Sequence, residues 1–322
     1  MISSSAKITS LDPQVVDASG SWLFWARDPD EQFRQSLREL GQLEPVLVAH
    51  DPGGLSLVAG YKRLKACHEQ GAAVQAVQIE ADTVTRGWIY FQSNRQSRLD
   101  SKDLVLAGRF FSQHLGQEEL LNILRRMVPS GADARLPDLI CRWLYLPADW
   151  DNLLQAGHIP LQATHWLSRL EEEELQALHP FFRELRWSES NARKFLARLT
   201  ETSLRERTSL SSLIQDSKLE SILQQDLSPK DRVQRLMHEA RRLRYPELTK
   251  LEDEFSDLVR QISQDSKWKI TADPSFETDR LGLSLAVSSP RELEEAVKEL
   301  QRMTERNELS RIWQWQWERL GK

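Results

Sequence analysis

Residues 60–63, Gly-Tyr-Lys-Arg, place a glycine and two cations at a predicted junction between a strand and a helix. Gly60 would let the backbone approach a ligand closely, and the N–H groups at a helix start attract phosphate oxygens. Lys62 and Arg63 would add positive charge. Cations at a helix N-terminus oppose the helix dipole, which favours an anionic partner there. The segment predicts a phosphate-binding turn; a solvated first turn of an amphipathic helix is the alternative.

A second polar segment, residues 92–104, carries Asn94, Arg95 and Arg98 ahead of a helix start at Asp100. A linker between two domains is the alternative interpretation of this segment. The two polar segments in this order are more specific than either one alone.

The elements around these residues predict a small α+β domain that ends near residue 98. Residues 1–30 are expected to be extended and loop-like. Apolar spacing and turn residues then predict a helix at 31–40, strands at 46–48 and 55–58, a helix at 62–70 and a strand at 74–79.

From Asp100 onward the apolar spacing becomes helical and predicts a domain of short helices over residues 99–200. Residues 201–227 are rich in Ser, Thr and Gln and predict a linker with a weak helix. Residues 228–322 predict a helix, a hairpin and a second helix, which would suit a C-terminal dimerisation module. The expected hairpin strands are residues 268–271 and 281–287, and the second helix starts from a capping box at residues 289–292.

The composition is that of an ordinary soluble protein with 322 residues and a net charge of −5. This charge argues against a protein that coats nucleic acid over its whole surface, but it permits a local basic face. The stretches 183–207 and 230–244 are such basic segments, with solvated helix faces as the alternative. The two cysteines fit neither a metal nor a disulfide spacing, and no apolar run is long enough for a membrane span. We therefore expect a cytoplasmic protein.

The polar segments and their spacing resemble the N-terminal domain of the ParB family of chromosome and plasmid partition proteins. Residues 41–45, 60–63 and 92–98 correspond to three boxes of that family, in the same order. Residues 117–146 stand where the family has its helix-turn-helix, and residues 146–163 resemble the continuation of that motif. The resemblance implies an α+β ParB/sulfiredoxin-like domain, a helix-turn-helix domain and a small α+β C-terminal module.

The resemblance also implies a site for CTP with Mg²⁺ and a surface for DNA. The nucleotide-binding positions carried over are Glu44, Gly60, Lys62, Arg63, Asn94 and Arg95. The candidate DNA-binding residues are Arg125, Arg126, Arg135, Arg142, Arg193 and Lys194. Tyr61 and Gln92 stand where the family has glutamates, and the loss of two hard oxygen ligands argues against CTP hydrolysis.

The function implied is a ParB-like DNA-binding protein in DNA partition or segregation, acting as a CTP-responsive clamp. It would be a nucleoid-associated homodimer, with a ParA-like ATPase as a further partner. One alternative is a ParB-like transcription regulator or mobile-element accessory protein without a nucleotide switch. A second is a nuclease or small-molecule enzyme on the same N-terminal fold. No catalytic residue and no metal ligand is predicted.

Overall fold

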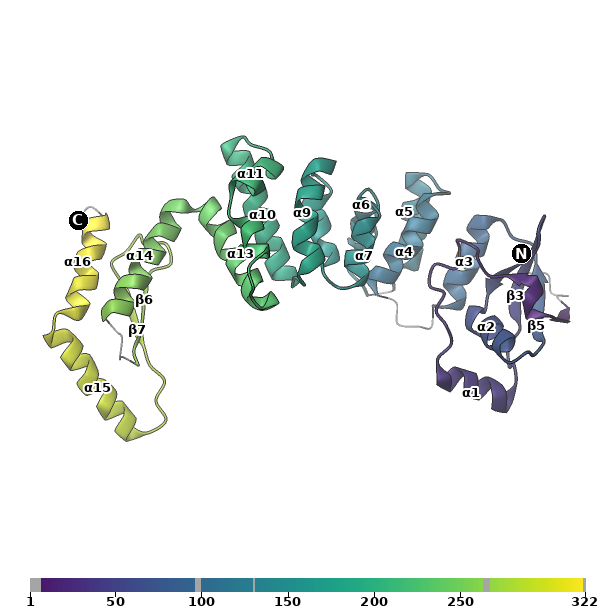
Figure 1. Cartoon of the computed structure of the whole chain (residues 1–322), viewed down its shortest axis with the longest axis horizontal. Helices are drawn as coiled ribbons and strands as arrows, with labels where there is room; N and C mark the ends of the chain where they lie inside the picture. Colours follow the sequence, from purple (N-terminus) through teal and green to yellow (C-terminus); the bar gives the residue numbers. More distant parts are fainter. Residues whose placement is uncertain (1–6, 96–99, 130, 263–266, 321–322) are drawn as a thin grey trace. The chain divides into compact units, whose positions relative to one another are not determined.

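The computed structural model describes residues 7–95, 100–129, 131–262 and 267–320. The chain divides into two compact units, Met1–Arg193 and Lys194–Lys322. The first holds a five-stranded sheet with helices and then a helical region, and the second holds further helices and a two-stranded sheet (Figure 1). Within the described residues, no helix is long and apolar enough to cross a membrane.

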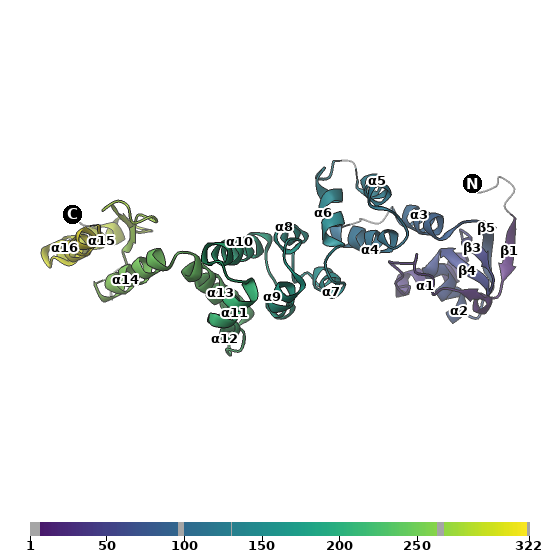
Figure 2. The same ribbon diagram turned by 90° about the horizontal axis from the view of Figure 1, so that it is seen from above.

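The five-stranded sheet has the order β1-β5-β3-β4-β2. Its strands are β1 (Ile8–Leu11), β2 (Val16–Asp17), β3 (Val46–Asp51), β4 (Gly54–Ala59) and β5 (Val74–Ile79). The predicted hairpin β3–β4 and the strand β5 are confirmed, and Figure 2 shows β1 at one edge beside β5. Residues 1–30 were expected to be extended and loop-like; they also contain the paired strands β1 and β2, which were not predicted. Both strands are short and mostly exposed, so pairing with β5 and β4, not apolar spacing, makes them strands.

Helices cover both faces of this sheet. Ala49, Val58, Val77 and Ile79 form a buried cluster against which Ile89 of α3 (Thr83–Ser93) packs. The side chains that alternate with this cluster face the other side, where α2 (Tyr61–Glu69) contacts β3 and β5. Helix α1 (Glu31–Leu40) has the predicted bounds but no buried residue.

Helix α3 connects the sheet to the helical region and was not predicted from the sequence. Gly87 lies within it, and a Cβ atom at this position would come within 2.2 Å of the Phe110 ring on α4 (Ser101–Ser112). The glycine lowers helix propensity, yet the two helices can pack closely because it lacks a side chain. The prediction at Asp100 is confirmed, because this residue caps α4 and forms a capping box with Asp103.

The helical region of the first unit begins with α4 and consists of short helices joined by short turns, as predicted. The following elements are α5 (Gln117–Met127), α6 (Leu136–Trp143), α7 (Asp149–Gln155), η2 (Leu161–Ala163), α8 (Thr164–Leu167), α9 (Glu172–Glu184) and α10 (Glu189–Glu206). Large aromatic side chains fill its interior, among them Trp143, Trp150 and Phe181, which are almost completely buried. Helix α10 continues into the second unit.

The segment 201–227 is not the linker that its composition predicted. It contains the end of α10, then α11 (Leu210–Asp216) and α12 (Leu219–Leu223). Leu210, Ile214 and Leu219 are almost completely buried, and α12 packs against α13 (Pro229–Arg244). The Ser, Thr and Gln residues concealed this pattern, because the apolar positions are few but fall on one side of two very short helices.

The C-terminal part of the second unit contains the predicted helix, hairpin and helix. Its elements are α14 (Pro246–Ile262), β6 (Lys269–Ala272), β7 (Leu281–Ser284), α15 (Pro290–Glu305) and α16 (Glu308–Leu320). The indoles of Trp313 and Trp317 both donate to Asp279, at 3.0 Å and 3.2 Å. Trp315 instead contacts Phe255 and Phe276, so the tryptophans lie on two different faces of α16.

Candidate functional site

A cavity of about 190 Å³ opens beside the glycine turn at the start of α2. Gly60 is the N-cap of α2, has φ of 101°, and offers no side chain to the first N–H groups of the helix. A Cβ atom here would also lie 2.8 Å from Val46. Glycine is therefore required for both the left-handed backbone and the close contact with β3, which keeps the helix start open to the cavity.

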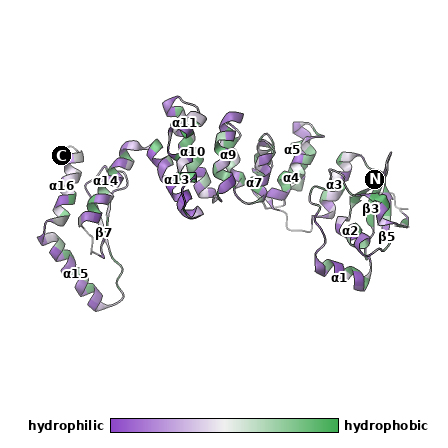
Figure 3. Cartoon of the chain, viewed as in Figure 1, coloured by the Kyte–Doolittle hydropathy of each residue, from purple (hydrophilic) through white to green (hydrophobic). Residues whose placement is uncertain are grey.

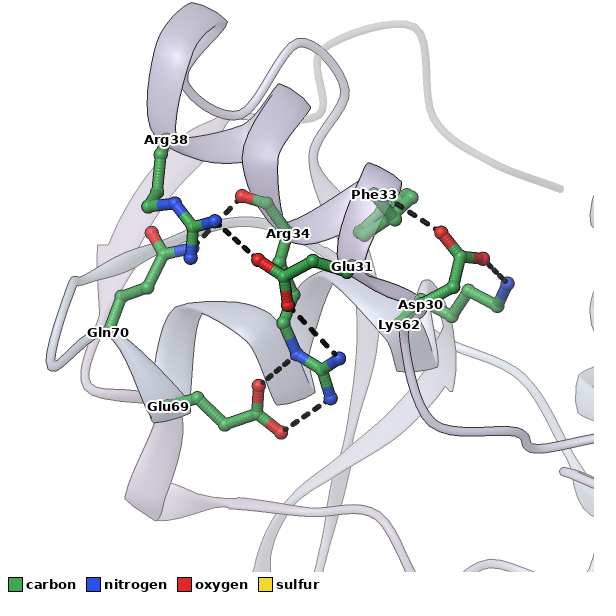
Figure 4. Close-up of polar contacts among 8 residues, drawn as sticks. All are labelled: Asp30, Glu31, Phe33, Arg34, Arg38, Lys62, Glu69 and Gln70. Atoms are coloured by element: carbon green, nitrogen blue, oxygen red, sulfur yellow. Dashed lines mark hydrogen bonds and ion pairs between the residues drawn. The ribbon is translucent and has the colours of Figure 1, made fainter.

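Three cationic side chains among the described residues line this cavity, namely Arg27, Lys62 and Arg63. The Lys62 Nζ atom donates to Asp30 at 3.2 Å (Figure 4), and Arg63 Nη1 lies 3.2 Å from the Glu44 carboxylate. Arg63 also donates to the carbonyl oxygens of Glu44 and Pro45, at 2.9 Å each. Arg63 thus holds the chain before β3 as well as adding charge to the cavity.

Aromatic side chains form much of the remaining wall. Trp25, Phe33, Tyr61 and Tyr90 line the cavity with the cations. Burial raises the pKa of Tyr90 to about 12, so its hydroxyl is protonated at neutral pH. Aromatic faces beside cations and helix N–H groups suit a ligand with both a flat ring and a phosphate.

The second polar segment meets the first at this cavity. Ser93 and Asn94 line the wall from the end of α3. Their side chains donate to the carbonyl oxygens of Ile89 and Tyr90, respectively, at 2.8 Å each. Arg95 is exposed and does not line the cavity, and neither does Glu44, while Arg98 lies outside the described residues.

The residues around the cavity do not fit a magnesium ion. Mg²⁺ takes oxygen ligands, with at least one or two carboxylates from the protein. Among the described residues, no carboxylate lines the cavity, and Tyr61 lies on its wall. No group of three or more His, Cys, Asp or Glu residues suited to a metal occurs in the part of the chain that the structure describes.

A second hollow of about 620 Å³ lies in the helical region and brings together three of the predicted DNA-binding residues. Arg135 precedes α6, Arg142 is in its last turn, and Arg193 is on α10. Gln162, His165 and Trp166 add polar and aromatic groups from η2 and α8, and acidic side chains are also present: Asp133, Asp138 and Glu189. We name this hollow the arginine groove.

The other predicted DNA-binding residues lie outside the arginine groove. Arg125 is exposed on α5, and the Arg126 guanidinium stacks over the Trp88 ring at 4.3 Å. Lys194 is exposed next to Arg193 but does not line the groove. Because Arg126 packs on an aromatic ring of α3, its charge also contributes to the contact between helices.

Sequence reasoning missed the contributions of Trp25, Arg27 and Tyr90 to the cavity. The first two lie in a segment expected to be a loop, and Tyr90 is on the unpredicted helix α3. The density of aromatic residues in 22–27 is a signal that could have indicated a packed segment. The ring of Trp25 lies 5.6 Å from that of Phe91, and its indole donates to Asp103 at 3.0 Å.

No protein-family model matches the chain, and no curated protein does. Among solved structures, a C-terminally truncated chromosome-partitioning protein ParB from Caulobacter crescentus, complexed to the centromeric parS site, is 16% identical. That match covers 65% of this chain and 100% of the other, with a TM-score of 0.32.

A second solved structure, a Pnob8-like ParB-N domain, is 13% identical. It covers 78% of this chain and 97% of its own, with a TM-score of 0.36. Both structures are ParB chains, the family that the sequence motifs resemble.

Proposed function

We propose that this chain is a ParB-like DNA-binding protein and that the arginine groove contacts DNA. The observation that carries the proposal is the convergence of Arg135 and Arg142, from the two ends of α6, and Arg193, from α10, on one groove. Guanidinium groups form bidentate hydrogen bonds with phosphates and with the edges of guanines. Such convergence favours a binding surface as the role of these arginines, because cations that only solvate helix faces would be scattered.

In this proposal α5 and α6 form the helix-turn-helix, and α6 enters the major groove of DNA with the arginines of the arginine groove facing the duplex. Arg135 pairs with Asp133 at 3.0 Å, whereas no ion pair of Arg142 or Arg193 is present among the described residues. Arg142 and Arg193 would therefore be the principal contacts. The acidic residues in the groove would disfavour uniform phosphate binding, so we expect contacts at a few defined positions.

The proposed cellular role is DNA partition or segregation, in a cytoplasmic, nucleoid-associated homodimer with a ParA-like ATPase as partner. The support is the family resemblance of the motifs and, for the homodimer, the exposed apolar residues of the C-terminal unit. A transcription regulator or mobile-element accessory protein is the alternative with the same DNA surface. Sequencing of the DNA bound to the protein in cells would separate a few clustered sites from many promoters.

We further propose that the cavity beside Gly60 binds a phosphate-bearing nucleotide, with CTP as the candidate from the resemblance. The support is the group of three cations, the open helix start and the aromatic wall. Because the cavity does not fit Mg²⁺, no hydrolysis is assigned to it. Release of cytidine diphosphate or of cleaved DNA would favour the alternative of an enzyme.

The groove proposal predicts that Arg142→Ala and Arg193→Ala together weaken binding to duplex DNA by about tenfold or more. For each arginine that binds a phosphate, its replacement also reduces the slope of log affinity against log salt by about one. Fluorescence anisotropy with a labelled duplex, at several salt concentrations, measures both quantities.

Arg38→Ala is the matched control for this experiment, because Arg38 is an exposed arginine on α1 outside the arginine groove. Its affinity should equal that of the unaltered protein. Equally weakened binding in the control and the groove variant would contradict the assignment, and so would a failure of the unaltered protein to bind any duplex at low salt.

A further inference from the structure

The cations of the cavity are held by acidic residues that do not line it. Asp30 pairs with Lys62, and Glu44 pairs with Arg63, at 3.2 Å in both cases. Asp30 is the N-cap of α1, and Glu44 follows the end of the same helix. The two acids therefore flank α1, and each neutralises one cation of the cavity from outside.

Helix α1 is fastened to its neighbours by polar contacts at the surface. None of its residues is buried, and Arg34 pairs with Glu69 of α2 at 2.8 Å (Figure 4). Arg38 pairs with Glu31 within α1 at 2.6 Å. Exposed ion pairs of this kind are weak and exchange partners at little cost. The segment that carries Asp30 and Glu44 can therefore adjust without opening the core of the sheet.

Asp30 also links the cavity to the first turn of α1. Its carboxylate accepts from the Phe33 N–H at 2.9 Å, and the Phe33 ring lines the cavity. The Phe33 N–H first, and Lys62 second, hold the pKa of Asp30 below its usual range, so this side chain is a carboxylate at neutral pH. A ligand that attracts Lys62 would leave Asp30 bound to its own helix.

We propose that the phosphate of the ligand replaces Asp30 and Glu44 as the partner of Lys62 and Arg63, and that it does so without a divalent cation. The inference rests on the phosphate site of the proposed function. A phosphate dianion carries more charge than a carboxylate and would also accept from the open N–H groups at the start of α2. The two acids thus compete with the ligand from within the chain.

The competition separates the roles of the two cations. Lys62 would exchange its single partner, Asp30, for the phosphate, because its ammonium donates to no other acceptor among the described residues. Arg63 would keep its two backbone carbonyl acceptors when Glu44 departs. We therefore expect the exchange at Lys62 to be the larger one.

The experiment measures the affinity of CTP and of inorganic pyrophosphate for the full chain by titration calorimetry, in EDTA and in magnesium. Asp30→Asn removes the charge but keeps a good N-cap, and Glu44→Gln leaves the backbone acceptors of Arg63 in place. Each variant should bind about two- to fivefold more tightly than the unaltered protein, as expected for loss of an exposed ion pair. A gain in affinity cannot come from unfolding.

Asp28→Asn is the control, because Asp28 is an exposed acid that pairs at 3.8 Å with Lys65, which lies outside the cavity. Its affinity should stay unchanged. Lys62→Met should weaken binding, and in this background Asp30→Asn should give no gain.

The outcomes distinguish this inference from the proposed function. Binding that occurs only with magnesium, or gains that are equal in Asp28→Asn and Asp30→Asn, would overturn the exchange while the phosphate site stands. If neither CTP nor pyrophosphate binds to the unaltered protein or to any variant, both the exchange and the phosphate site are overturned.

Discussion

Arg86 joins the sheet, α3 and the aromatic segment that lines the cavity. Its guanidinium donates to both oxygens of Asp51 at 2.8 Å and to the Ala81 carbonyl oxygen at 2.9 Å. The same group stacks over the Trp22 ring at 4.8 Å, and the Trp22 indole donates to Leu57 at 2.7 Å. The almost completely buried Arg86 guanidinium thus has hydrogen-bond partners and an aromatic contact. These contacts hold Trp22, and with it the chain just before Trp25, against the sheet.

The Asp51–Arg86 pair predicts a specific pH dependence of stability. Hydrogen bonds from Arg86, and next from Ser56, lower the pKa of Asp51 from 3.8 to about 2. A carboxyl whose pKa is lowered by folding stabilises the folded state above its unfolded pKa, and this contribution is lost as the pH falls through the folded pKa. The difference in unfolding free energy between the unaltered protein and Asp51→Asn should therefore shrink from pH 4 to pH 2.

Urea denaturation at several pH values measures this difference. Asp12→Asn serves as the control, because Asp12 is exposed and its side chain accepts only from the nearby Gln14 N–H among the described contacts. A constant difference across the pH range for Asp51→Asn would contradict the assignment.

Helix α6 is positioned by one partly buried ion pair. Arg109 of α4 donates to both oxygens of Asp151 at 2.9 Å, and also to the carbonyl oxygens of Leu144 and Leu146. The indole of Trp143 donates to Asp151 at 2.7 Å. Because these groups come from α4, α6 and α7, the pair determines where the last turn of α6, with Arg142, meets the arginine groove.

Replacement of Asp151 by alanine should lower the free energy of unfolding by about 3 kcal/mol, because the Arg109 charge and the Trp143 N–H lose their partner in a buried place. Asp133→Ala is the matched control: it removes an arginine partner from an exposed pair and should change stability by less than about 1 kcal/mol. Chemical denaturation measures both variants. Equal effects would show that the buried pair has no special role.

The C-terminal unit exposes apolar residues that its own core does not use. Leu293 and Val297 are one turn apart on α15 and are 52% and 46% exposed. Figure 3 shows hydrophobic and hydrophilic residues mixed along this helix. Large exposed apolar residues on one helix face are typical of an interface, which supports the proposed homodimer.

The dimer proposal predicts that Leu293→Glu with Val297→Glu yields a monomer, because two charges would be buried in the interface. Arg302→Glu is the control, since Arg302 is exposed and lies on the side of α15 opposite to Leu293 and Val297. Size-exclusion chromatography with light scattering measures the mass. A monomeric unaltered protein, or a dimeric double variant, would contradict the proposal.

Local signals in the sequence predicted most of the regular elements. The bounds of α1 and β5 were predicted to the residue, because apolar spacing and turn or cap residues mark both segments. Helix α3 was missed because Gly87 and several β-branched residues weaken its helical pattern. The buried helices in 201–227 were missed for the related reason that polar residues outnumber the apolar ones that pack.

The sequence by itself determined the glycine turn at Gly60, its adjacent cations and the order of the motifs, because these depend on residue type and short spacing. Only the tertiary structure decided that Trp25, Arg27 and Asn94 share a cavity with Lys62. It also decided which cations have acidic partners and which arginines converge on one groove. Such contacts join residues far apart in the chain, and their distances depend on how the sheet and helices pack, which no local period encodes.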